Sequence, residues 1–225
     1  MPFKEIGITP QFLVLEVYHA IKDHGFIGGG CVRSLHQNSA ITDIDIFCFA
    51  EENYSIIRDS IINLGFEEIY SNPMLTKFRR IDVDDELDNN VTKFIEVISP
   101  RQERRLLTFG QPEQVISNFD FTICRAALLN ATTALVDDCF ESDVEDKRLR
   151  IRNIVCPLTT TKRIAKYGSY GYKIGVSEAI KLFSHWDSMS FEDRTDLVKM
   201  LKAVENHEEL TAEQEQIMKA IVYVD

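Results

Sequence analysis

Two aspartates in the segment 42–47, TDIDIF, most constrain what this chain can fold into. The alternation of polar and apolar residues predicts a strand over about 41–49, whose side chains point alternately to its two faces. Asp43 and Asp45 therefore share one face. Two carboxylates held side by side repel each other, and a divalent cation between them removes this repulsion, because hard cations favour oxygen ligands. The segment thus predicts a metal site on a strand.

Three consecutive glycines precede this strand in the chain. The segment 26–33, FIGGGCVR, predicts a short strand, a glycine turn and the start of a short helix. Because glycine has no side chain, Gly29 and Gly30 would let the backbone approach a phosphate closely. Arg33 lies one turn into the helix, where it would contact a phosphate, stabilise the site or form an internal ion pair. The turn and the aspartates together predict metal-dependent handling of a nucleoside triphosphate.

These motifs resemble the head domain of the polymerase-beta-like nucleotidyltransferases, with the tRNA CCA-adding enzymes and bacterial poly(A) polymerases as the nearest branch. A second match is the segment 120–126, DFTICRA, which is similar to the R-D-F-T-I-N-A motif of that branch. A third and looser match is the segment 162–166, KRIAK, which lies where the branch carries an arginine-rich neck helix. The resemblance covers about residues 26–174.

The resemblance implies an α+β fold, in which a mixed sheet is flanked by helices. It implies a pyrophosphate-releasing transferase that moves a nucleoside monophosphate from a nucleoside triphosphate to an acceptor hydroxyl, most simply an RNA 3′ end of the tRNA type. Asp43 and Asp45 would hold two Mg²⁺ ions, and Asp120 would support the nucleotide site. Glu96 is the candidate for a third catalytic carboxylate, because its strand could lie beside the aspartate strand and the branch carries a Glu at a similar place. The alternative for Glu96 is a solvent-facing position on a half-exposed sheet.

The chain departs from the motifs of that branch at three positions. Ser34 stands where the branch has Asp, Phe119 where it has Arg, and Cys124 where it has Asn. A clear E-D-x-x-R nucleotide-selecting motif is also missing from the sequence, so templated CCA addition is not expected. Two alternatives therefore stay open. One is a toxin-type nucleotidyltransferase that modifies a protein or a small molecule, and the other is an inactive nucleotide-binding module.

The net charge of −11 argues against a protein that coats nucleic acid in general. The segment 147–173 nevertheless lacks Asp and Glu and carries eight basic residues, with three tyrosines interleaved near its end. Such a strip could follow a phosphate backbone and stack on bases, or it could be a helix face balanced by carboxylates elsewhere. The candidate RNA-binding residues are Arg150, Arg152, Lys162, Arg163 and Lys166.

We expect residues 1–150 to form the nucleotidyltransferase head. Residues 151–225 are expected to form the basic neck and a small helical appendage, with Phe183 and Trp186 in its core. Arg101 and Arg105 are expected on one face of a short helix after Pro100, and the segment 121–129 as a strand in which Arg125 needs a carboxylate partner.

The expected location is the cytoplasm. The longest apolar runs are too short to span a bilayer. The five cysteines are scattered and lie mostly in apolar runs, which favours small buried thiols in a reducing compartment.

Overall fold

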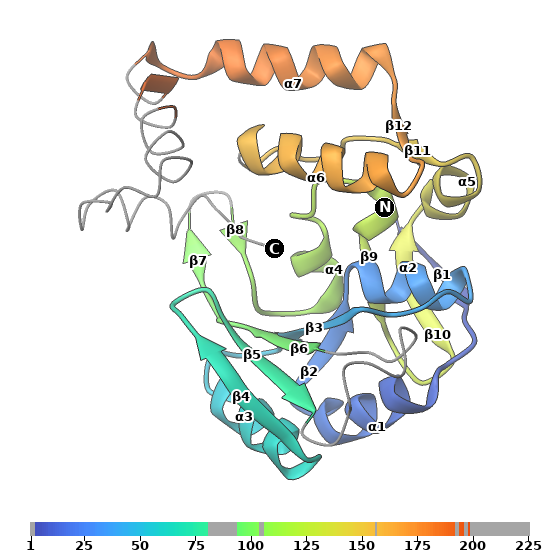
Figure 1. The fold of residues 1–225 in the computed structure, drawn as a ribbon, viewed down its shortest axis with the longest axis vertical. Helices are drawn as coiled ribbons and strands as arrows, with labels where there is room; N and C mark the ends of the chain where they lie inside the picture. Colours follow the sequence, from blue (N-terminus) through green and yellow to red (C-terminus); the bar gives the residue numbers. More distant parts are fainter. Residues whose placement is uncertain are drawn as a thin grey trace.

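The computed structural model describes residues 3–80, 94–103, 106–155, 157–191, 194, 195 and 198. Their centre is an eight-stranded mixed sheet with the order β1-β10-β9-β2-β3-β6-β5-β4 (Figure 1). Among the described residues of this sheet, β3 and β6 form the parallel pair, and the other neighbours are antiparallel. The strands are β1 (Phe3–Gly7), β2 (Gly25–Gly28), β3 (Asp43–Cys48), β4 (Phe66–Ser71), β5 (Leu75–Arg80), β6 (Phe94–Ile98), β9 (Ala126–Leu128) and β10 (Thr133–Asp137).

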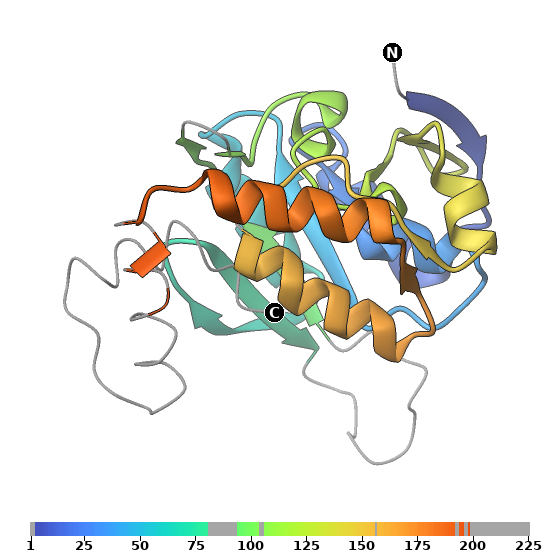
Figure 2. The same ribbon diagram turned by 90° about the horizontal axis from the view of Figure 1, so that it is seen from above.

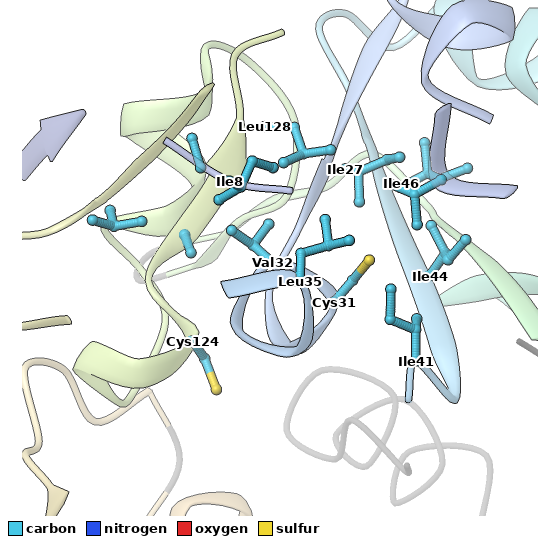
Figure 3. Packing of buried hydrophobic residues seen from close by; sticks show 14 of the residues in the cluster. Ile8, Ile27, Cys31, Val32, Leu35, Ile41, Ile44, Ile46, Cys124 and Leu128 are labelled. Carbon is cyan, nitrogen blue, oxygen red and sulfur yellow. The ribbon is translucent and has the colours of Figure 1, made fainter. Parts of the chain in front are cut away.

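Three helices contribute the apolar side chains that cover one face of the sheet: α1 (Phe12–Ile21), α2 (Gly30–His36) and α3 (Asn53–Asn63). Ile44 and Ile46 point from β3 into this layer, where they are fully buried. Figure 3 shows them facing Cys31 and Leu35 of α2. The alternation along β3 thus buries the isoleucines against the helices and directs Asp43 and Asp45 to the opposite face.

The opposite face of the sheet carries a smaller apolar cluster and a cleft. The short helix α4 (Pro112–Ile116) covers part of this face through Val115 and Ile116, which pack with Phe26 and Phe47. Helices α6 (Pro157–Ser169) and α7 (Val176–Ser188) lie side by side as a further layer (Figures 1 and 2). The fold is therefore of the α+β class, a mixed sheet flanked by helices, as the sequence predicts.

The remaining described elements are short. The strands β7 (Gln102–Glu103) and β8 (Leu106–Leu107) form one small antiparallel pair. The strands β11 (Arg148–Leu149) and β12 (Lys173–Ile174) form a parallel pair. This second pair joins the end of the predicted head to the segment between α6 and α7. A helix α5 (Phe140–Glu145) and a 3₁₀ turn η1 (Thr122–Cys124) complete the arrangement.

Three local expectations from the sequence are wrong, and one strand was not expected. The segment after Pro100 forms the β7–β8 pair and not a helix, and Arg105 lies outside the described residues. The segment 121–129 begins as η1 and becomes a strand only at Ala126. The first strand, β1, has no counterpart among the predicted elements. Phe183 is 71% exposed on α7, so it does not belong to the core among the described residues.

Other expectations are confirmed. The strands β5 and β6 pair with each other, and β6 lies beside β3. Arg125 pairs with the buried Asp137, at 3.4 Å between Nε and Oδ2. Of the predicted C-terminal appendage, α7 is described, and most of the chain beyond this helix lies outside the described residues. In the part of the chain that the structure describes, no helix has the length and apolar character needed to cross a membrane.

Candidate functional site

Asp43 and Asp45 line a cleft between the sheet and helix α6. Both carboxylates are half-buried on the same face of β3, and Asp43 accepts a hydrogen bond from the Thr42 hydroxyl at 3.1 Å. The structure thus brings the two predicted metal ligands to one opening. Many of the other lining residues come from the glycine turn, from α2, from the segment 118–124 and from α6 with the turn that follows it; they include Gly29, Gly30, Arg33, Asn118, Phe119, Asp120, Cys124, Thr159, Arg163, Lys166, Tyr167 and Tyr170.

The glycine turn lies directly against one of these carboxylates. Gly29 has a φ of +73°, which side chains of L-residues rarely allow, and its N–H donates to the carbonyl of Ala126 at 2.9 Å. A Cβ at this position would lie 3.1 Å from Oδ2 of Asp45. Glycine is therefore required at this position for two reasons: it adopts the positive φ, and it leaves space beside Asp45. The bare backbone at Gly29 and Gly30 borders the same cleft, where the sequence predicts a phosphate.

Glu96 lies next to Asp45 in the sheet but has a partner of its own. The register aligns Asp45 with Glu96, and Glu96 in turn with Lys77 of β5, so the three side chains share one face. The Lys77 ammonium donates to Oε1 of Glu96 at 2.7 Å. The Glu96 side chain is 13% exposed and does not line the cleft. The structure thus places the predicted third carboxylate beside the aspartates and engages it in an ion pair.

Arg33 packs into an aromatic cluster behind the cleft. Its guanidinium carbon lies 5.1 Å from the ring centroid of Tyr167 and 6.0 Å from that of Tyr172. Its Nη1 is 3.8 Å from Sγ of Cys124, which also lies 2.9 Å from the Tyr167 hydroxyl. Burial alone would lower the pKa of Arg33, but Cys124 and the two tyrosines outweigh it and raise that pKa. The guanidinium therefore keeps its charge.

Asp120 joins the head to α6. Its side chain is buried, and Oδ2 accepts hydrogen bonds from the Thr160 hydroxyl and from Nη1 of Arg163, both at 3.0 Å. Its backbone carbonyl accepts from the N–H of Arg152 at 2.8 Å. Asp120 lines the cleft and also anchors the helix that closes one side of this cleft.

Three of the five predicted RNA-binding residues are engaged with carboxylates of this chain. Arg150 pairs with the buried Asp143 through Nε at 2.9 Å and Nη2 at 3.1 Å. This hydrogen bonding raises the pKa of Arg150. Arg152 pairs with the buried Asp137 in the same two-pronged way. Arg163 is the partner of Asp120, whereas Lys162 is exposed on α6 and Lys166 lines the cleft.

Asp137, Asp138 and Cys139 form a second group of potential metal ligands, with their ligand atoms within 4.8 Å of one another. Arg152 contacts both carboxylates, and Arg125 also contacts Asp137. These arginines already balance the negative charge, so this group is better explained as an internal ion-pair cluster than as a metal centre.

The thiol beside the aspartates is not suited to nucleophilic attack. Cys31 is buried, and its burial, followed by the charges of Asp45 and Asp43, raises its pKa. Burial likewise raises the pKa of Cys124 and of Tyr167. These groups therefore stay protonated at neutral pH.

Sequence reasoning missed Lys77 and Thr160. The signal for Lys77 was its position on a strand predicted to pair with the strand of Glu96. Writing out the residue register of this pair would have placed Lys77 opposite Glu96. Thr160 gave no signal in the sequence, because its partner, Asp120, is 40 residues away in the chain.

Comparison with known proteins identifies both a family and a fold. The model of the Gabija anti-defense 2 family protein, Gad2, matches residues 8–147. "Gabija anti-defense 2" of Bacillus phage SPbetaL7 is 24% identical over 174 residues, which are 76% of this chain and 40% of that protein. The chain thus matches well under half the length of this relative.

Solved structures of tRNA-processing enzymes share the fold. A CCA-adding enzyme in complex with CTP matches with a TM-score of 0.58 at 15% identity, over 98% of this chain and 55% of the enzyme. A tRNA nucleotidyltransferase complexed with a primer tRNA and an incoming ATP analogue matches with a TM-score of 0.51 at 17% identity, over 74% of this chain and 48% of that one. At such identities the likeness concerns the fold.

Proposed function

This chain belongs to the Gabija anti-defense 2 family, and we propose that it is a Mg²⁺-dependent nucleotidyltransferase that moves a nucleoside monophosphate from a nucleoside triphosphate to an acceptor hydroxyl. The observation that carries the proposal is the pairing of Asp43 and Asp45 on one face of β3, at a cleft bordered by the glycine turn. The nucleotidyltransferase fold supports this assignment.

The residues at the cleft fit a pair of Mg²⁺ ions. Two half-buried carboxylates on one strand supply hard oxygen ligands, and the missing side chain at Gly29 leaves room beside Asp45. When bound, the metal would neutralise charge on the triphosphate, activate the acceptor hydroxyl and stabilise the leaving pyrophosphate. Asp43 and Asp45 would hold and space these ions, while Cys31 and the isoleucines behind them keep β3 fixed against α2.

The triphosphate would lie along the glycine turn. Gly29 and Gly30 present bare backbone to the cleft. Arg33 borders the same space, and the rings of Tyr167 and Tyr172 hold its guanidinium in place. It would therefore offer a phosphate a positive charge at a fixed position. Asp120 would support the nucleotide indirectly, because it holds Arg163 and the cleft-facing side of α6 in place.

We propose an RNA 3′ end as the acceptor. Lys166 of α6 and Tyr170, which directly follows this helix, line the cleft; Tyr170 is 51% exposed, and Lys162 is exposed on α6. A basic side chain next to an exposed aromatic ring suits a phosphate followed by a stacked base. Because Arg150 and Arg152 are bound to buried carboxylates, their contribution to RNA binding would be small.

A protein acceptor is the second candidate. The family is described as anti-defense proteins, and a transferase could act against a defence by labelling a protein hydroxyl. The internal pairing of Arg150 and Arg152 favours this alternative, because it shortens the basic strip available to RNA.

The decisive experiment incubates the purified protein with each α-³²P-labelled nucleoside triphosphate and Mg²⁺, in the presence of total RNA or of a cell protein extract. Asp43→Asn and Asp45→Asn are the test variants. Asp138→Asn, which alters an exposed carboxylate away from the cleft, is the matched control. We expect label to be incorporated by the protein and by the control, and to be lost in both test variants.

The acceptor follows from where the label appears. Label on RNA that falls steeply with added salt supports the RNA proposal, whereas label on polypeptide supports the protein acceptor. Incorporation that persists in Asp43→Asn and Asp45→Asn would overturn the metal assignment. Triphosphate binding without any incorporation would support an inactive nucleotide-binding module.

A further inference from the structure

We propose that Lys77 is a positioning residue that holds Glu96 away from the metal ions and so limits the cleft to two carboxylate ligands, Asp43 and Asp45. This inference rests on the proposed function, and it concerns the strength with which the cleft binds a divalent cation. It assigns to Glu96 a role different from that of a third catalytic carboxylate.

The register of three strands places the relevant groups in one row. Asp45, Glu96 and Lys77 are aligned across β3, β6 and β5, so their side chains leave the same face of the sheet. Glu96 is thus the immediate neighbour of Asp45. In the absence of Lys77, its carboxylate would be an additional oxygen donor on the same face of the sheet as an ion held by Asp45.

Two contacts fix the position of the Lys77 ammonium. It donates to Oε1 of Glu96 at 2.7 Å, and it lies 4.3 Å from the ring centroid of Phe94. Phe94 is the register partner of Asp43, the other proposed metal ligand. The ammonium therefore lies toward the Asp43 side of Glu96. The Lys77 and Glu96 side chains are only 28% and 13% exposed, so water screens their pairing less than it would at an open surface.

The ion pair has two effects on a nearby cation, and both act in the same direction. It occupies an oxygen of Glu96 that would otherwise be a ligand, and it adds a positive charge that repels the cation. Asp43 and Asp45 line the cleft whereas Glu96 does not, in agreement with a carboxylate drawn toward β5. Removal of the ammonium should therefore strengthen metal binding, although it removes a native contact.

Manganese(II) is the probe for the test, because its paramagnetic signal reports free and bound ion without any catalytic turnover. The full chain is titrated with Mn²⁺ as the unaltered protein and as Lys77→Met, Lys77→Met/Glu96→Gln, and Asp45→Asn. Lys4→Met is the matched control, because Lys4 also pairs with a glutamate, Glu141, but on β1 at the other end of the sheet. Thermal unfolding of each variant monitors the fold.

We expect Lys77→Met to bind Mn²⁺ about tenfold more tightly than the unaltered protein, because both the repulsion and the competition for Glu96 are lost. The double variant should lose most of this gain, Lys4→Met should match the unaltered protein, and Asp45→Asn should abolish binding. Unchanged or weaker binding by Lys77→Met, with Asp45→Asn still abolishing it, would overturn the role of Lys77 alone. Binding that survives in Asp45→Asn would overturn both this inference and the proposed metal site.

Discussion

Gly29 lies where the glycine turn and a carboxylate of β3 come closest. We predict that Gly29→Ala weakens both Mn²⁺ binding and nucleotidyl transfer, because the new Cβ, 3.1 Å from Oδ2, would push Asp45 away from its position. The positive φ at this position would also strain the alanine backbone, and this strain would lower the free energy of unfolding by about 1 to 2 kcal/mol. Metal titration, the labelling assay and urea unfolding measure the three effects.

Gly65 offers a matched control for this substitution. Its φ is +86°, and a Cβ there would meet nothing within 4 Å. Gly65→Ala should therefore lower stability through backbone strain but leave Mn²⁺ binding unchanged. Equal losses of Mn²⁺ affinity in the two variants would show that Gly29 acts through general stability and not through Asp45.

Asp137 is the residue on which the internal ion-pair cluster depends. Its fully buried carboxylate faces Arg125, which is almost as deeply buried, and Arg152. We predict that Asp137→Asn lowers the free energy of unfolding by about 3 kcal/mol, because it leaves a buried cation without its counter-charge. Chemical denaturation provides the measurement.

The neighbouring Asp138 serves as the comparison for Asp137. It pairs with the same Arg152, but its side chain is 52% exposed. Asp138→Asn should cost less than about 1 kcal/mol, as for exposed ion pairs in general. If Asp137→Asn also lowered the free energy of unfolding by less than about 1 kcal/mol, Arg125 would have to find another partner in that variant.

At the scale of elements, Asp120 links helix α6 to the head. We predict that Arg163→Met lowers the free energy of unfolding by about 2 kcal/mol and raises amide hydrogen exchange along α6, because the buried Asp120 would lose its guanidinium partner on that helix. Lys162→Met, one residue earlier and exposed, is the control and should leave exchange unchanged. Hydrogen-exchange mass spectrometry measures the protection of α6 in the two variants. Equal protection in both would contradict the proposal that Asp120 holds this helix through Arg163.

The elements that the sequence predicted best are those with a strong local pattern. The glycine turn, α2 and β3 carry turn residues and a clean alternation, and the pairing of β5 with β6 follows from two apolar strands around one polar loop. The order of these elements also sufficed to place Glu96 beside the aspartate strand. The acidic face of the cleft was therefore predictable, down to the face on which Asp43 and Asp45 lie.

The elements that the sequence missed depend on partners far away in the chain. The strand β1 pairs only with β10, which is more than a hundred residues further on, and its own five residues show little periodicity. The 3₁₀ turn at Thr122 is held by Asp143, to which the Thr122 hydroxyl donates at 2.7 Å. For the same reason the sequence could not tell whether Arg150 and Arg152 face RNA or carboxylates, because the chain has 36 acidic residues and only the fold selects the partners.

For the whole molecule, we predict that stability falls as the pH rises above about 9. Burial raises the pKa of Cys48 to about 12, and also raises that of Cys31 and Cys124. In the unfolded chain a thiol loses its proton near its ordinary pKa of 9.0, whereas the folded chain still holds it. The folded state then binds more protons, so its stability decreases by up to about 1.4 kcal/mol per pH unit for each such thiol.

Urea unfolding at pH 8 and at pH 10 checks this expectation. Cys48→Ala removes one of the titrating thiols, so its stability should fall less steeply across this interval than that of the unaltered protein. Its lower absolute stability does not affect the comparison, because the slope with pH is what is measured. Identical slopes in the two proteins would show that Cys48 does not contribute to the alkaline loss.

The parallel pairing of β3 with β6 also determines when β3 gains its second neighbour during synthesis of the chain. Parallel neighbours need a crossover, and here α3, β4 and β5 are all made before Phe94–Ile98 can add to the sheet. A ribosome-bound fragment that ends in β5 already contains both aspartates and the glycine turn, yet it lacks the strand that supports β3 on its other side. The two carboxylates are thus synthesised early, the strand that supports β3 follows about fifty residues later, and the cleft itself requires α6, which is made later still.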